Sequence, residues 1–327
     1  MLKRKMLTVI VALALLCTAA ASASVITGLK EKNAFQEAAG KGNAAQVEKM
    51  EDFRYTRIDP EEIVADSSAQ RDEIPEMSGG NDAAVFVPEV HETSADPKVE
   101  IYNKMLNSID YFNNVSLTME TSMLGDGITT VEYTFDIQSG TAYQAEKNGD
   151  TAISETYSEG GNMILVNNLA RTYTQNYLPT YTRSDTPYIP LESRVTTAED
   201  GIPTYTYRRN ITNCPLASYS VVPQEIAFSY LKDFDKWDIT DDDVTFLDRS
   251  CVKITGSPSP YIAAKHNIDS FSMVVDSATG ILLDFSGTFG GTVSRYMTVT
   301  ECFLETRTAV PQFNADSYAG YTESPRR

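Results

Sequence analysis

From residue 97 onward, the apolar residues recur with a spacing of three or four residues in some segments and of two residues in others. Between Ile101 and Phe112, apolar residues recur every three or four positions, which places them on one face of a helix of about four turns. Asp96-Pro97 fits an N-cap with proline at the first helical position. From Val115 the period drops to two, as in a strand with one buried face. The sequence therefore predicts a helix followed directly by a β-sheet.

Short alternating segments separated by turns make up most of the remaining chain. A second apolar stripe, from Ile226 to Phe234 and opened by Pro223, predicts a second helix. A sheet of about 9–11 strands tends to curl. We therefore predict an α+β fold, in which a curled antiparallel β-sheet (an unclosed half-barrel) is covered by two main helices. The expected strands are residues 115–122, 131–137, 141–147, 151–158, 162–167, 171–177, 244–255, 270–275, 281–286 and 292–303.

Residues 178–222 interrupt this pattern with repeated prolines and tyrosines. A tyrosine side chain has an apolar body and a polar tip, which suits either packing on the sheet or a recognition surface. A loop of this length in a compact domain is usually functional or mobile. We favour packing for this Tyr-rich segment.

The first 23 residues have the pattern of a secretory signal. Lys3-Arg-Lys5 is basic, Met6–Leu16 is apolar but too short to span a bilayer, and Ala21-Ser-Ala23 offers a cleavage site. The alternative, a lipid anchor at Cys17, is disfavoured because Leu16 stands where that processing needs a small residue. No later stretch is apolar enough for a transmembrane segment, so we expect a secreted, extracytoplasmic protein.

Charge and composition set the domain boundaries. Removing residues 1–23 takes away three basic residues, so the formal charge falls from −18 to −21. Such a chain is repelled by nucleic acid. Residues 48–96 contain 14 acidic against four basic residues and few bulky apolar ones, which predicts a largely disordered tether. The expected domains are a signal peptide at 1–23, an acidic tether at 24–96, a β-rich domain at 97–308 and a C-terminal tail at 309–327.

The sequence offers no pattern typical of a catalytic or metal site. Cys214, Cys251 and Cys302 lack the spacing of a metal or redox motif, and their disulfide pairing stays open, with one bridge at most. We expect His266 on the solvated surface. The aspartates at 238, 241, 242 and 243 lack the residues that an EF-hand needs, so we interpret them as a loop that ends a helix. We therefore expect no enzyme, no bound metal and no cofactor.

The order of elements resembles that of the LolA/LolB/RseB-like superfamily of exported lipoprotein-handling and envelope-sensing domains. The resemblance spans about 210 residues. It rests on the helix at 101–112 followed by the strand at 115–123, and on a strand that ends in Asp276, a Thr279-Gly280 turn and a resuming strand. From the residues alone, we expect Asp276 to close an Asx-type turn. The resemblance implies an unclosed β-barrel whose helix-capped concave side can hold acyl chains or a hydrophobic partner segment. The closing segments that take part are Trp237-Asp-Ile, Arg249–Gly256, Phe271–Leu283 and Gly290–Val293.

We expect an exported non-catalytic domain that binds a hydrophobic ligand (a lipid, acyl chain or lipoprotein) or senses the envelope state, through a groove between sheet and helices. One alternative is a cell-surface interaction module that binds an envelope protein through the tether and the Tyr-rich segment. Another is a hydrolase of wall polymers, which needs two carboxylates roughly 5–10 Å apart. The candidate groove residues are Tyr102, Met105, Ile109, Met119, Tyr133, Phe135, Ile226, Tyr230 and Trp237.

Overall fold

A computed structural model describes residues 94–123, 127–178, 181, 183–197, 203–209, 211, 213–306 and 309–324. These residues belong to one compact unit of the chain. The predicted signal peptide at 1–23 lies outside the described residues, and so does the predicted tether except for residues 94–96.

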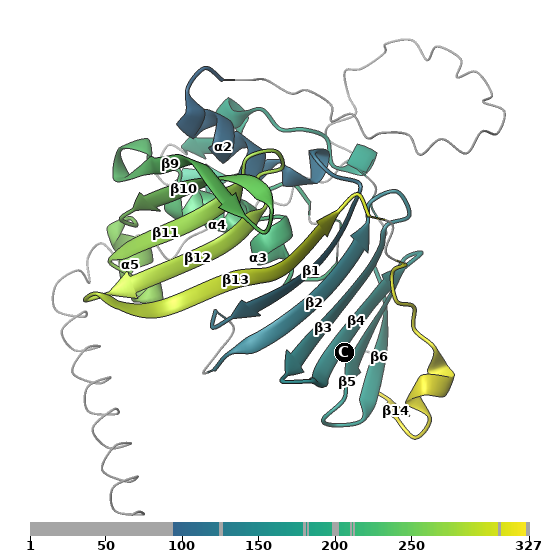
Figure 1. Cartoon of the computed structure of the whole chain (residues 1–327). Coiled ribbons are helices and arrows are strands. Elements are labelled where there is room, and N and C mark those ends of the chain that lie inside the picture. Colours follow the sequence, from purple (N-terminus) through teal and green to yellow (C-terminus); the bar gives the residue numbers. More distant parts are fainter. Residues whose placement is uncertain are drawn as a thin grey trace, which may run out of the picture. The chain divides into compact units, whose positions relative to one another are not determined.

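One twelve-stranded sheet dominates the fold, in the order β14-β6-β5-β4-β3-β2-β1-β13-β12-β11-β10-β9. The β1 strand pairs antiparallel with β13, which joins the meander β1–β6 to the meander β9–β13 (Figure 1). Because β14 and β9 end the order without pairing with each other among the described residues, the curled sheet is unclosed and the predicted α+β half-barrel is confirmed. The strands are β1 Asn114–Thr121, β2 Thr129–Asp136, β3 Thr141–Asn148, β4 Thr151–Glu159, β5 Asn162–Asn167, β6 Thr172–Tyr177, β9 Trp237–Phe246, β10 Arg249–Gly256, β11 Ser270–Asp276, β12 Leu282–Phe289, β13 Thr292–Leu304 and β14 Thr322–Glu323.

The sheet differs from the prediction at both ends. The single strand expected at 244–255 is wrong, because the chain turns at Leu247 and Asp248, whose φ angles are 50° and 59°. A two-residue turn with positive φ at both positions suits a tight hairpin, but no glycine announces it here. The aspartates expected in a helix-ending loop therefore lie on β9. At the other end, β14 pairs parallel with β6, which makes the sheet mixed rather than purely antiparallel.

The helices lie where the apolar stripes predict them but are shorter. The Asp96 side chain caps α2 (Pro97–Leu106) by accepting a bond from the Lys98 amide at 2.9 Å. The helix ends at Asn107, and a 3-10 turn, η3, continues it. The second stripe forms α4 (Gln224–Tyr230). The prediction missed α5 (Pro260–His266), which Ser259 caps and a left-handed Asn267 ends. Further short elements are η3 Ser108–Asp110, η4 Arg183–Asp185, η5 Leu191–Ser193, η6 Phe234–Lys236, η7 Ala315–Tyr318, α3 Ser218–Val221 and the hairpin β7 Val195–Thr197 with β8 Pro203–Tyr205.

The core lies between these helices and one face of the sheet, where β1–β3 and β9–β13 contribute its buried residues. The Tyr230 ring of α4 packs on the rings of Phe271 and Phe285, with centroids 5.2 and 5.1 Å away. In α3, the Ser220 hydroxyl donates to the carbonyl of Leu282 at 2.8 Å. The apolar stripe of α4 therefore faces the sheet, and the stripe of α2 is buried in the same core cluster, as predicted from their spacing.

The turn between β11 and β12 holds α2 against the sheet. Asp276 closes it as an Asx-type turn, since its Oδ1 accepts bonds from the Thr279 amide (2.8 Å) and hydroxyl (2.7 Å). Lys104 of α2 donates to the Ser277 carbonyl at 2.8 Å. Gly280 has φ +74°, and a Cβ there would lie 2.4 Å from the carbonyl carbon of Lys104. The turn thus brings its own backbone against the helix backbone.

The Tyr-rich segment packs on the core, as favoured from the sequence. The rings of Tyr205 and Tyr207 contact Phe228, with centroids 5.2 and 4.8 Å away. The fully buried guanidinium of Arg194 donates to the carbonyl of Leu106, at the end of α2, at 3.1 Å. Two further contacts join Arg208 to the Asp110 carboxylate at 2.5 and 2.9 Å. These groups form the buried arginine cluster, which consists of Arg194, Arg208, Asp110, Asn107 and Gln224.

Candidate functional site

The nine predicted groove residues do come together, but inside the packed core. Tyr102 and Met105 lie on α2, Ile109 in η3, and the others on β1, β2, α4 and the start of β9. Each of the nine is at most 3% exposed, and all belong to one continuous cluster. The Trp237 indole also donates to the carbonyl of Leu231 at 2.8 Å. These side chains are therefore buried core residues and do not line an open groove.

An open hollow of about 440 Å³ lies beside this core, between α2 and the edge strand β9. We call it the α2–β9 groove. Its apolar lining comes from Ile101 on α2, Ile239 on β9 and Val252 on β10. The volume falls in the range of about 300–1,000 Å³ that is usual for ligand sites. Because Ile101 is itself part of the core cluster, the groove and the core share a wall.

The rim of the groove is charged and mostly acidic. Glu100, Asp241 and Asp242 line it together with Lys104. The Lys104 ammonium lies 3.3 Å from the Glu100 carboxylate, so this cation is already paired. The rim therefore has a negative balance, which favours uncharged or cationic head groups over anionic ones.

The core contains a polar atom without a hydrogen-bond partner among the described residues, the hydroxyl of Tyr102, which does not line the groove. The side chain is 3% exposed, and Phe228 and Phe234 meet its ring edge-on at centroid distances of 6.5 and 5.4 Å. Burial raises the pKa of Tyr102, so the hydroxyl stays protonated. An unsatisfied buried polar group costs about 1–3 kcal/mol.

Sequence reasoning missed the open part of the site, namely Ile239, Val252 and the rim aspartates. All but Val252 lie on β9, whose first half was not predicted as a strand. The alternation in Trp237-Asp-Ile239-Thr is a signal that could have revealed it, although the aspartates that follow hide the pattern.

His266 is half-buried rather than fully solvated as expected. Its Nδ1 lies 2.8 Å from the Tyr230 hydroxyl, at the end of a helix that was not predicted. Burial, followed by the charges of Arg295 and Lys265, lowers the pKa of His266 to about 4. The ring is therefore neutral at physiological pH and packs on the core.

Cysteine and metal chemistry add no further site to the described part of the chain. Cys214, Cys251 and Cys302 form no disulfide among the described residues. Within the same residues, no group of three or more His, Cys, Asp or Glu side chains could hold a metal ion. No helix among them is long and apolar enough to cross a membrane.

No protein-family model and no curated protein matches this chain. Among solved structures, it is similar to an uncharacterized conserved protein from Thermus thermophilus, with 8% identity over 71% of this chain and 100% of that chain and a TM-score of 0.35. It is also similar to MucB in the MucA/MucB complex of Pseudomonas aeruginosa (15% identity, 68% of this chain, 60% of that chain, TM-score 0.36). A third similar structure is the lipoprotein LppX of Mycobacterium tuberculosis, with 12% identity over 67% of this chain and 100% of that chain and a TM-score of 0.35. At these identities and TM-scores, the likenesses carry no argument about the superfamily, the role or the ligand of this chain.

Proposed function

We propose that this protein acts outside the cytoplasm and binds the apolar chain of a lipid or lipoprotein, with the α2–β9 groove as the mouth of the site. The observation that carries the proposal is the lining of the groove: Ile101, Ile239 and Val252 make an apolar hollow at the open edge of the sheet. An acyl chain laid there removes apolar surface of its own from water, which is worth about 0.8 kcal/mol for each buried CH₂.

The anchoring of α2 favours opening at its N-terminal half. The C-terminal half is held by Arg194 on the Leu106 carbonyl and by the close approach of Gly280 to Lys104. The N-terminal half is held by Lys98, which donates to the Phe234 carbonyl at 2.8 Å and pairs with an exposed Asp238. Exposed ion pairs contribute little, about 0–1 kcal/mol. A small outward movement of this half would therefore widen the groove toward the core.

The core behind Ile101 is suited to such a movement. Met105 and Met119 are fully buried there. Methionine is unbranched and flexible, so it refills irregular space at a small cost.

The same geometry disfavours the Tyr-rich segment as the main recognition surface. Arg194 and Arg208 tie this segment to α2 through buried hydrogen bonds. The rings of Tyr205 and Tyr207 in this segment pack against the ring of Phe228. We therefore favour binding of an apolar chain over the interaction module.

A polar residue in the groove lining should abolish most of the binding. We expect full-length protein to bind the uncharged apolar probe N-phenyl-1-naphthylamine saturably, with a rise in its fluorescence. The variant Ile239→Asp places a carboxylate among apolar side chains, and we expect its Kd to be at least about tenfold higher, or 1.4 kcal/mol. Fluorescence titration measures this directly.

The matched control is Val293→Asp, which makes the same kind of change on an exposed strand position, 55% exposed, away from the groove. Its Kd should equal that of the wild type. Lipid extraction and native mass spectrometry of the purified protein should then identify the natural acyl species. Equal Kd values in both variants, or no saturable binding in the wild type, would refute the proposal.

A further inference from the structure

A second hollow lies on the other face of the sheet, under the C-terminal segment. Residues 309–324 run across β3–β6 and end in β14, which pairs with β6. Phe313 anchors the segment, since its ring stacks on Tyr318 at 5.2 Å and meets the rings of Tyr157 and Tyr173 at 5.7 and 5.5 Å. The Tyr318 hydroxyl donates to the Glu155 carboxylate at 2.8 Å. The segment is therefore a fixed wall of the hollow.

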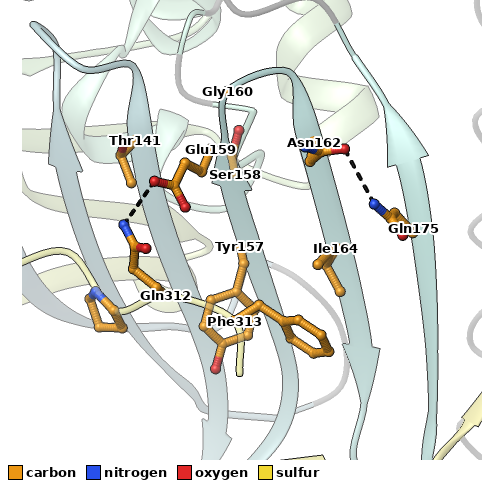
Figure 2. A pocket seen from close by; sticks show the side chains of 11 residues that line it. Thr141, Tyr157, Ser158, Glu159, Gly160, Asn162, Ile164, Gln175, Gln312 and Phe313 are labelled. Atoms are coloured by element: carbon orange, nitrogen blue, oxygen red, sulfur yellow. Dashed lines mark hydrogen bonds between the residues drawn. The ribbon is translucent and has the colours of Figure 1, made fainter. Parts of the chain in front are cut away.

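This hollow, which we call the tail pocket, has a volume of about 270 Å³. Figure 2 shows two hydrogen-bonded pairs on opposite sides of it: Gln312 with Glu159, and Gln175 with Asn162. Their distances are 3.0 and 3.3 Å. At one end of the view, the rings of Tyr157 and Phe313 lie next to each other. The pocket thus combines an aromatic end with two polar sides.

The chemistry of the lining selects among ligand classes. Among the described residues, no Lys, Arg or His lines the tail pocket, and Glu159 is its single acidic residue, so phosphate and carboxylate ligands have no cation to bind. The three carboxamides of Asn162, Gln175 and Gln312 each carry two N–H donors and a carbonyl acceptor. A hydroxyl group is also a donor and an acceptor, so several hydroxyls on one ligand match this set. The C–H face of a ring would lie on the aromatic end.

We propose that the tail pocket binds a neutral polyhydroxylated ring, that is, one sugar residue of a glycan. The volume supports a single ring, since about 270 Å³ is just below the range of drug-sized sites. The site is separate from the α2–β9 groove in its residues and its face of the sheet, so the inference goes beyond lipid binding and does not depend on it.

The test is a saturation-transfer NMR titration of the full-length protein with N-acetylglucosamine, methyl β-glucoside and methyl β-galactoside. We expect at least one pyranoside to give saturable transfer, and the open-chain polyol mannitol to give none, because it has no ring to place on Tyr157 and Phe313. The variant Gln175→Leu removes one carboxamide and keeps the volume, and we expect a Kd at least fivefold higher. Phe313→Leu should weaken binding further.

Gln138→Leu is the matched control, because Gln138 is an exposed amide in the β2–β3 turn, outside the tail pocket. It should leave the Kd unchanged. Since Phe313 also anchors the C-terminal segment, the decision rests on Gln175→Leu, and its naphthylamine affinity should stay at the wild-type value. No transfer to any of the three pyranosides, or the same Kd in Gln175→Leu as in the wild type, would overturn the proposal.

Discussion

Replacing Asp110 by alanine is expected to lower the free energy of unfolding by about 3–5 kcal/mol, the loss typical of breaking a buried ion pair. Asp110 is 3% exposed and binds Arg208 through two hydrogen bonds of 2.5 and 2.9 Å. Arg194 lies beside this pair and donates to carbonyl and carboxamide oxygens. Burial, and then the charge of Arg208, lower the pKa of Arg194 to about 9. Without the carboxylate, two buried guanidinium groups would face each other unbalanced.

Urea unfolding followed by circular dichroism measures this loss. Asp150→Ala, at an exposed position in the β3–β4 turn, is the control and should stay within about 0.5 kcal/mol of the wild type. The double variant Asp110→Leu with Arg208→Met should recover part of the stability, because apolar replacement of a whole buried pair is often neutral. A loss below about 1 kcal/mol in Asp110→Ala would contradict a large contribution of the Asp110–Arg208 pair to the free energy of unfolding.

The second large effect is expected at Gly280. In Gly280→Ala, the new Cβ would meet the backbone of α2, 2.4 Å from the Lys104 carbonyl carbon and 2.6 Å from the Met105 amide nitrogen. Helix backbone cannot move aside as a flexible side chain can. The positive φ costs an alanine about 1–2 kcal/mol, and overpacking adds about 1–3 kcal/mol. We therefore expect a total loss of about 2–5 kcal/mol in the free energy of unfolding.

Gly290→Ala separates the two contributions. Gly290 also has a positive φ, +58°, but a Cβ added there would meet no described atom within 4 Å. Gly290→Ala should therefore lower the free energy of unfolding only by the cost of the positive φ, about 1–2 kcal/mol. Chemical denaturation of both variants gives the difference. Because α2 is one wall of the α2–β9 groove, Gly280→Ala should also weaken naphthylamine binding, while Gly290→Ala should not. Equal losses of stability would show that α2 yields to the added methyl group.

The regular part of the fold follows from local pattern. Alternation from Val115 onward and the glycine turns at Asn148-Gly149 and Gly160-Gly161 are short-range signals, and the strands they predict are present. The turn at Leu247-Asp248 has positive φ without glycine, so its hairpin left no comparable signal. On β9, the alternation that begins at Trp237 stops after Ile239, because the aspartates that follow are exposed to solvent.

The candidate site was also predictable from the sequence only in part. Helical spacing identified Tyr102, Met105 and Tyr230 as members of one buried wall, because a stripe of apolar residues on a helix must face the core. It could not reveal which side of that wall is open, since this depends on where the sheet ends. Nor could it reveal the buried arginine cluster, because Arg194 and Arg208 lie in a proline-interrupted segment and reach Asn107 and Asp110 only through tertiary contacts.

The two ends of the sheet differ in how they meet solvent. The β6 edge is partly covered, because β14 pairs with it at Thr172 and Tyr173. The β9 edge ends the strand order of the described residues, and its aspartates include Asp238, whose side chain is 79% exposed. A bare strand is a template for self-association, and like charges on it keep a second copy away. Asp241 and Asp242, which belong to the acidic rim of the groove, also lie on this edge strand, so their charge disfavours edge-to-edge pairing with a second copy.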